Sequence, residues 1–428
     1  MFIFLRSCGA FLFSFLLLLQ NSEAQERLSL QQALDLARAS NPRLLAAQKE
    51  VDAAHARILQ AEAVPNLEFG LNWDETPSNF NVTAAGERNI GLLQPFEFPG
   101  KRGARRHVAK IDQKLFEENL RRTELLISAE VKRAYYQAWL HEKSLANFEA
   151  IADLLTQFRE TATARYQAQK VTFLEVLRAK TEWAKINNEI VAARREAQNS
   201  LAELNRLLAR PGATLITLAD DFTYVPFTKT AETVVNEMRQ ISVSRRLSET
   251  LLARGHAQMR MAQKSYLPDF AIGLFHQKRD GRPPFTADHP LGTTENNLWG
   301  IDIGVSLPLW YWKGPRGQTE EARALIDLAQ IQREAVERNV TTAIENAYRS
   351  VKAAEEQVRL FEESLLRDVE DELRSGISHY QTDQIDALNL IDIYRTYTAT
   401  QAEYYRALYN YHVALADLEV AGETDLQP

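Results

Sequence analysis

A long stretch of the chain, residues 104–210, contains neither glycine nor proline. As one helix, at about 1.5 Å per residue, it would be roughly 160 Å long, so it must fold back on itself. Its apolar positions alternate by three and four up to Ala162, as in a coiled-coil seam, and a new apolar run begins at Val171. The pattern predicts a helical hairpin with helices at about 104–166 and 172–208 and a tip at 167–170.

The segment before this hairpin has a period of two. Its apolar residues alternate with polar or small ones, at Leu67, Phe69, Leu71 and Trp73. This alternation predicts a strand at about 66–75 with one apolar face, and a second strand follows at about 88–98. Two short helices precede the strands: Ser29 and Gln32 form a capping box, and Asn41-Pro42 opens a helix to about residue 64.

The second half of the chain repeats the first. Pro65 recurs as Pro268, an offset of 203, and Pro95 recurs as Pro308, an offset of 213, so about ten residues are inserted within 278–297. The repeat predicts strands at about 269–278 and 297–309 and a hairpin at about 317–421 with its tip near 376–386. The chain therefore divides into residues 25–225 and 226–428, two repeats that interleave in one protomer, and the fold class is mainly α with a small β part.

Four amphipathic strands of about ten residues have the length that crosses a bilayer when tilted. Packing of their apolar faces on the long helices in water is the alternative. Lipid does not tolerate open sheet edges, and four strands cannot close a barrel alone. In a membrane the chain must therefore oligomerise, with twelve strands in a trimer or eight in a dimer.

The amino-terminal residues and the composition narrow the class further. Residues 1–24 have the pattern of a secretory signal, with cleavage expected after Ala24 and an uncleaved membrane anchor as the alternative. The single cysteine, Cys8, lies within this segment, which excludes disulfides and thiolate chemistry in the mature chain. A net charge of −7 argues against a nucleic-acid partner. No catalytic constellation, metal-ligand spacing or cofactor motif is found, so we expect no enzyme activity and no cofactor.

Two segments carry a family resemblance: 91–105, which reads GLLQPFEFPGKRGAR, and 165–177, which reads RYQAQKVTFLEVL. With the signal and the tandem repeat, the chain resembles the TolC family of outer-membrane efflux factors, most closely its heavy-metal (CzcC/CusC-type) branch. The resemblance implies a homotrimer in the outer membrane of a Gram-negative-type cell, with a twelve-stranded barrel and a long periplasmic α-barrel. It also implies a periplasmic adaptor and an inner-membrane pump, of RND type, as partners.

The resemblance also assigns candidate site residues. A tunnel constriction is expected at Tyr166, Glu175, Tyr380, Asp386, Asn389 and Asp392, where a three-fold axis would turn each inward acid into a ring that attracts cations. The two tyrosines could tie neighbouring helices or simply pack. The adaptor-docking tips are expected at Ala168, Gln169, Lys170, Val171, Thr172, Thr382, Asp383, Gln384 and Ile385. Gln169 and Asp383 replace a usual glycine, which disfavours a tip geometry with positive φ.

A basic cluster lies where the second strand becomes the long helix. It comprises Lys101, Arg102, Arg105 and Arg106, and we expect contact with lipid phosphates on the periplasmic side of the membrane, with a solvated helix start as the alternative. The predicted elements and the resemblance favour a passive efflux duct, and the resemblance to the heavy-metal branch implies heavy-metal cations as the cargo. A drug or type I protein-secretion duct of the same family is the first alternative, and a periplasmic coiled-coil adaptor or scaffold is the second.

Overall fold

The computed structural model describes residues 26–76, 78, 82, 85–279, 297–382 and 384–424. The predicted signal, most of the inserted loop and Asp383 lie outside these residues. The chain forms two compact units. One, the strand unit, comprises Ala47–Leu120 and Val243–Arg338, and the other, the tip unit, comprises Met1–Ala46, Arg121–Ser242 and Asn339–Pro428. Each unit therefore contains parts of both sequence repeats.

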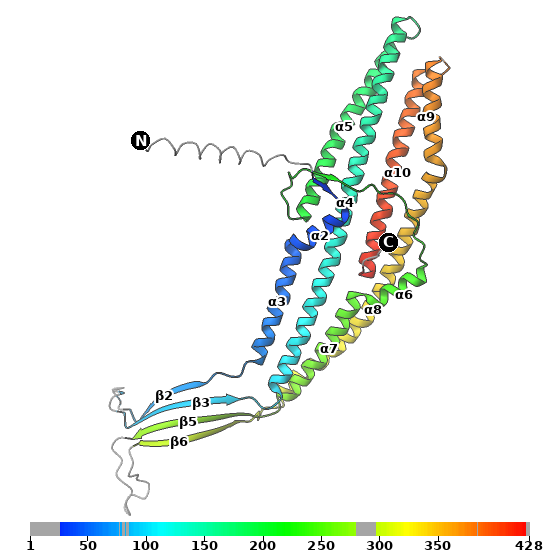
Figure 1. Ribbon diagram of the computed structural model, residues 1–428. Helices are drawn as coiled ribbons and strands as arrows, with labels where there is room; N and C mark the ends of the chain where they lie inside the picture. Colours follow the sequence, from blue (N-terminus) through cyan, green and yellow to red (C-terminus); the bar gives the residue numbers. More distant parts are fainter. Residues whose placement is uncertain are drawn as a thin grey trace, which may run out of the picture. The chain divides into compact units, whose positions relative to one another are not determined.

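The strand unit contains a four-stranded antiparallel sheet in the order β2-β3-β5-β6 (Figure 1). Its strands are β2 (Glu68–Asp74), β3 (Glu87–Phe96), β5 (Asp269–Arg279) and β6 (Asn297–Ser306). The central pair joins the two repeats, since Phe96 on β3 pairs with Phe270 on β5. The outer strands β2 and β6 are the two edges of the sheet.

The register places the alternating apolar residues of all four strands on one face. Phe69 pairs with Leu92, which pairs with Leu274 and then Ile301, and all four are exposed. Trp299, Ile301 and Ile303 on β6 are between 71% and 77% exposed. Since these large side chains remain exposed in the described chain, packing of this face against the long helices, the water-soluble alternative, is not what the structure has.

The opposite face carries the small and polar residues of each strand. Here Gly91 pairs with Phe275, which pairs with Gly300. The Phe275 ring covers Gly300 so closely that a Cβ atom there would lie 2.2 Å from Phe275 Cζ. An aromatic ring on this face therefore requires glycine on the neighbouring strand.

Long helices continue from the ends of the strands. The first two lie between β3 and β5 in the chain, α4 (Lys101–Gln167) and α5 (Phe173–Leu207), and the others follow β6, α8 (Gly314–Leu360), α9 (Leu366–Gln381) and α10 (Ala387–Gly422). A π-helical turn, η2 (Phe361–Leu365), separates α8 from α9. The shorter helices are α2 (Leu30–Ser40), α3 (Pro42–Glu62), α6 (Ala231–Ile241) and α7 (Val243–Lys264). No helix in the described ranges is both long and apolar enough to cross a membrane.

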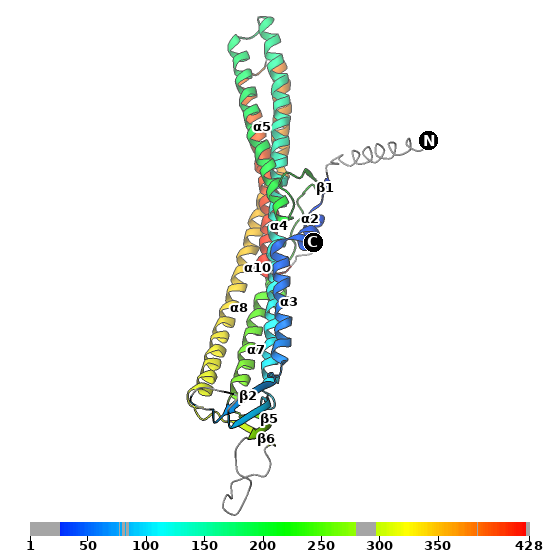
Figure 2. The ribbon, with the colours of Figure 1, turned by 90° about the vertical axis from the view of Figure 1, so that its left-hand side faces the viewer.

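In the tip unit the helices form two hairpins, α4 with α5 and α9 with α10, which the two views show side by side (Figure 1 and Figure 2). The indole of Trp183 on α5 donates to Thr156 Oγ1 on α4 over 3.0 Å. The predicted seam of α4 is buried at Ile151, Leu155, Phe158 and Ala162. The expected hairpin, with its turn near residue 168, is therefore confirmed.

An extended segment, residues 208–230, crosses the helices of the tip unit. It contributes β4 (Ile216–Leu218), which pairs in parallel with β1 (Glu26–Leu28). Asp220 accepts hydrogen bonds from Leu30 N and from the Tyr135 hydroxyl, and Asp221 accepts one from the Trp139 indole. These bonds fasten the segment to α2 and α4.

The elements together confirm the predicted fold class, mainly α with a small β part.

Candidate functional site

The first hairpin tip is closed by a Schellman motif in which glutamine replaces glycine. Gln169 has φ 60°, and Lys170 N donates to Arg165 O over 2.9 Å while Gln169 N donates to Tyr166 O over 2.9 Å. The expectation that the tip avoids a positive φ at residue 169 is wrong. Two backbone bonds to the end of α4 hold the left-handed residue, and this offsets its steric cost.

At the second tip, as at the first, a backbone N–H after the helix donates to the carbonyl five residues earlier. Gln384 N donates to His379 O over 2.8 Å, and Thr382 N donates to Ser378 O over 3.2 Å. Asp383, between them, lies outside the described residues. The next helix, α10, begins with Asp386 as its N-cap, whose carboxylate accepts from Asn389 N over 2.9 Å.

One hydrophobic cluster contains residues from both hairpins. Its buried members come from all four helices near the tips, at Ile151, Leu155, Phe158, Ala162, Val176, Ala179, Leu373, Tyr380, Ala387, Leu390, Ile391 and Tyr394. Both candidate tips therefore belong to one packed body. The predicted constriction residues come from the same helical segments, α4, α5, α9 and α10.

The two tip tyrosines, which are equivalent in the repeat, have different environments. Tyr380 is 2% exposed, packs edge-on against Phe158 with centroids 5.1 Å apart, and lies under the Arg165 guanidinium, 4.6 Å from its ring centre. Tyr166 is exposed, and the centroid of its ring lies 5.4 Å from that of Phe173. Burial raises the pKa of Tyr380, and its hydroxyl has no hydrogen-bond partner among the described residues. Within one chain Tyr380 is thus a packed ring.

The acidic constriction candidates differ in their charge partners. Asp392 is exposed and forms an ion pair with Arg395 at 3.3 Å, and Arg395 also pairs with Glu182 at 2.8 Å. Burial opposes ionisation of Glu182, but its bonds with Lys185 and Arg395 lower the pKa of this carboxyl below its usual value. Glu175 is half-buried, and its Oε2 atom has no hydrogen-bond partner in the described part of the chain. Sequence reasoning missed the contacts of Arg165, Glu182 and Arg395, since their partners Tyr380, Arg395 and Glu182 lie on other helices.

A mostly apolar groove lies between α4, α5 and α10 in the tip unit. Its volume is about 300 Å³, and its walls include Phe148, Ile186 and Tyr394, with Glu182 and Arg395 at its edge. The groove is open, so another helix could contact these side chains.

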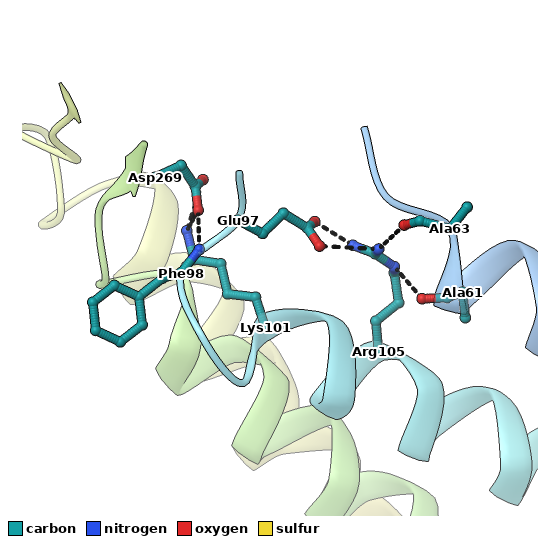
Figure 3. A network of polar contacts seen from close by, with 7 residues as sticks. All are labelled: Ala61, Ala63, Glu97, Phe98, Lys101, Arg105 and Asp269. Atoms are coloured by element: carbon teal, nitrogen blue, oxygen red, sulfur yellow. Dashed lines mark hydrogen bonds and ion pairs between the residues drawn. The ribbon is translucent and has the colours of Figure 1, made fainter. Parts of the chain in front are cut away.

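At the start of α4, in the strand unit, three of the four predicted phosphate-binding cations have partners within the chain, and Figure 3 shows two of them, Lys101 and Arg105. Lys101 binds both oxygens of Asp269 at 2.8 Å, and its side chain is only 17% exposed. Arg105 binds Glu97 and donates to the carbonyls of Ala61 and Ala63, at the end of α3, over 3.0 and 3.2 Å. These bonds tie α3, β3, β5 and α4 together.

The other two cations complete the junction. Arg106 forms an ion pair with Glu62. Arg102 is exposed and has no hydrogen bond or ion pair to any described residue. Contact with lipid phosphates stays a prediction, and within the cluster Arg102 is the side chain most available for it. No group of three or more His, Cys, Asp or Glu in the described ranges could hold a metal ion.

Comparison with known proteins defines the class. The family described as outer membrane efflux protein matches residues 33–210 and 246–421, and the chain belongs to this family. The cobalt-zinc-cadmium resistance protein CzcC of Cupriavidus metallidurans is 23% identical over 382 residues, which cover 89% of this chain and 87% of that protein. The recognition of the family and of its CzcC/CusC-type branch from the sequence is therefore confirmed.

Solved structures share the fold. CusC matches with a TM-score of 0.74 and 16% identity, covering 92% of each chain. The CmeC outer membrane channel of Campylobacter jejuni matches with a TM-score of 0.73 and 14% identity, covering 92% of this chain and 85% of that one. The MtrE outer membrane channel of Neisseria gonorrhoeae matches with a TM-score of 0.70 and 17% identity, covering 92% of this chain and 89% of that one.

Proposed function

We propose that this chain is the outer-membrane duct of a tripartite efflux system, a homotrimer that conducts solute from an inner-membrane pump to the exterior and catalyses no reaction. The observation that carries the proposal is the four-stranded sheet with an exposed apolar face and two unpaired edges, β2 and β6. In lipid such edges must be paired. Three copies, each joining its β6 to the next copy's β2, close a barrel of twelve strands.

The sheet topology supports this closure. All three pairings are antiparallel, so β2 and β6 run in opposite directions, and a β6-to-β2 junction between copies continues the antiparallel pattern. The test is the oligomeric state of the detergent-extracted protein. We expect heat-modifiable trimers from the outer membrane. Monomers that stay in the periplasm would contradict the duct and favour the adaptor or scaffold alternative.

The tips are the proposed contact surface for the adaptor of an RND-type pump. The groove between α4, α5 and α10 has the apolar wall and charged edge that an amphipathic helix fits. Photo-crosslinkers at Lys170, Val171, Gln384 and Ile385 should capture the adaptor in cells. A crosslinker at exposed Lys110 on α4 in the strand unit should not. Absence of the adaptor from all four tip positions would contradict docking at the tips.

Heavy-metal cations are the proposed cargo. The support is the similarity to a cobalt-zinc-cadmium resistance protein and the carboxylates Glu175, Asp386 and Asp392 in the tip unit. A deletion strain should become sensitive to cobalt, zinc and cadmium but not to drugs, and the full chain should restore resistance. Sensitivity to drugs alone would favour the drug-efflux alternative. Loss of a secreted protein with neither sensitivity would favour type I secretion.

A further inference from the structure

Three consecutive aromatic residues follow β6 and lie exposed in a turn before α8. Trp310, Tyr311 and Trp312 are 67%, 55% and 50% exposed. The turn is ordered by two backbone bonds, Lys313 N to Trp310 O and Arg316 N to Tyr311 O, both 3.0 Å long. Tyr311 and Trp312 pack edge to face at 5.4 Å. The rings are therefore held together by the chain while their outer surfaces remain uncovered.

The equivalent turn of the first repeat is built differently. With the offset of 213 that relates Pro95 to Pro308, Trp310 takes the place of Glu97. Gly314 takes the place of Lys101, and Gln318 that of Arg105. The residues that form the ion-pair network at the start of α4 are thus absent at the start of α8, and exposed aromatic rings stand there.

We propose that this aromatic turn, residues 310–313, is the site at which the protein contacts the headgroup interface of a lipid bilayer, in the leaflet on the side where α8 begins. The inference rests on the proposed function. Tryptophan and tyrosine rings favour the headgroup level because one end is apolar and the other polar. The side chain of exposed Lys313, which has no hydrogen-bond or ion-pair partner among the described residues, supplies a cation at the level of the lipid phosphates.

Continuity with the apolar face of the sheet identifies the bilayer as the occupant. On β6 the exposed apolar side chains continue without interruption from Trp299 through Val305, and Leu307 and Leu309 extend the row to the turn. A surface that is apolar over the length of a strand and ends in Trp-Tyr-Trp-Lys matches the depth profile of a membrane, apolar within and mixed at the boundary. The first repeat meets the same boundary with cations that are mostly paired within the chain.

The depth of the turn can be measured with spin labels on single cysteines. The only cysteine of the chain, Cys8, lies in the predicted signal, so a Cys8→Ser background takes one label at a chosen site whether or not the signal is cleaved. The sites are Tyr311→Cys in the turn, Ile303→Cys on β6, and Arg323→Cys on the exposed surface of α8. The full-length protein is reconstituted in phospholipid vesicles. Collision rates are then measured with oxygen, which enters hydrocarbon, and with a water-soluble nickel chelate, which does not.

We expect oxygen collisions to dominate at residue 303, chelate collisions at residue 323, and intermediate rates at residue 311. A label at residue 311 that behaves like the one at 323, with residue 303 still in hydrocarbon, overturns this inference and leaves the duct intact. A label at 311 shielded from both reagents shows that protein covers the turn, which also overturns it. Chelate collisions at residue 303 would overturn the duct itself.

A second measurement tests whether the rings fix the depth of the barrel. With the label at Val305→Cys, the double variant Trp310→Ala with Trp312→Ala should raise the chelate collision rate. Trp310→Tyr with Trp312→Tyr keeps the amphipathic rings and should leave the rate low. The control, Tyr166→Ala with Phe173→Ala, removes two exposed rings from the first tip and should have no effect. An unchanged chelate collision rate in the variant Trp310→Ala with Trp312→Ala overturns the role of the rings.

Discussion

At the scale of single residues, several helices of this chain end on a left-handed residue other than glycine. Gln169, Ala209 and Glu423 have φ of 60°, 55° and 52°. Each is followed by the backbone bond that closes a Schellman motif, as from Arg210 N to Asn205 O at 2.9 Å. Left-handed backbone costs an L-residue about 1–2 kcal/mol. The tips and helix ends therefore hold strain that two bonds per motif offset.

Replacing Gln169 by glycine should stabilise the first tip by about 1 kcal/mol, because glycine has no Cβ to clash in this conformation. Hydrogen exchange of the Gln169 and Lys170 amides, which reports local opening, should slow. The matched control is Gln167→Gly, in the last turn of α4, where φ is helical and glycine should destabilise by about 1 kcal/mol. Faster exchange in both variants would contradict the assignment of strain to Gln169.

A second residue, His412 on α10, makes stability depend on pH. It lies between the rings of Tyr136 and Phe222, at 5.2 Å from each, and its Nε2 atom is buried without a partner in the described chain. Burial lowers the pKa of His412 from 6.5 to about 4, against the opposing effect of a hydrogen bond with the Thr223 backbone. The folded protein therefore holds this side chain neutral.

The sign of the effect follows from proton linkage. Between pH 6.5 and 4 the unfolded chain binds a proton at His412 and the folded chain does not, so the free energy of unfolding falls as the pH falls. The loss from this residue is absent above pH 6.5 and reaches about 3 kcal/mol near pH 4. Guanidinium unfolding gives the free energy of unfolding of wild type and of His412→Phe at pH 7.5 and at pH 4.5. We expect this free energy to fall more between the two pH values in wild type than in the variant. An equal pH dependence in the two proteins would contradict it.

At the scale of elements, the π turn η2 accounts for a shift in the repeat. Phe148 recurs as Phe361, an offset of 213, but Tyr166 recurs as Tyr380, an offset of 214. α4 has 67 residues, whereas α8, η2 and α9 have 47, 5 and 16, which is 68 in all. The π turn absorbs the additional residue. It keeps the tip residues of both hairpins in one cluster although the second helix is longer.

Deleting Glu363 from the π turn should therefore be tolerated, because it removes the additional residue and leaves a regular helix with Leu373 and Tyr380 on the same face. The matched control is deletion of Glu356, an exposed residue in the regular part of α8. There α9 would rotate by about 100° and shift about 1.5 Å, which takes Leu373 and Tyr380 out of the cluster at a cost of about 2–5 kcal/mol. Thiol labelling of Leu373→Cys should stay slow in the Glu363 deletion and become fast in the Glu356 deletion. Fast labelling in the Glu363 deletion would contradict the assignment.

At the scale of the whole molecule, each compact unit combines segments from both sequence repeats. Alternation of period two predicted the strands and their apolar face, because a sheet face is a local property of a strand. The alternation of apolar residues by three and four predicted the buried seam of α4, because the face of a helix is also a local property. The partners of Lys101 and Arg105 could not be predicted, since Asp269 lies in the other repeat and Glu97 forms no motif with them. The burial of Tyr380 depends on Arg165 and Phe158 from another hairpin, which no local pattern shows.

Trimer formation would give the tip carboxylates an effect that one chain does not have. A three-fold axis repeats Asp386 and Asp392 as rings, which favour cations if they line the passage. Arg395 pairs with both Asp392 and Glu182, and Lys185 also pairs with Glu182, so the charges of this group balance, but the Asp392 side chain stays 69% exposed. Asp386 caps α10 and has no ion pair among the described residues. Both acids are therefore available to bias conduction.

The variant Asp386→Asn with Asp392→Asn should reduce cation preference in single-channel recordings of the reconstituted protein under a salt gradient. Asparagine is as good an N-cap as aspartate, so α10 keeps its start while each chain loses two charges. The matched control is Asp371→Asn, an exposed acid of α9 that pairs with Arg374, and it should leave the reversal potential unchanged. An unchanged reversal potential in the double variant would place both acids outside the conduction path, whereas a shift in the control as well would show that only the total charge matters.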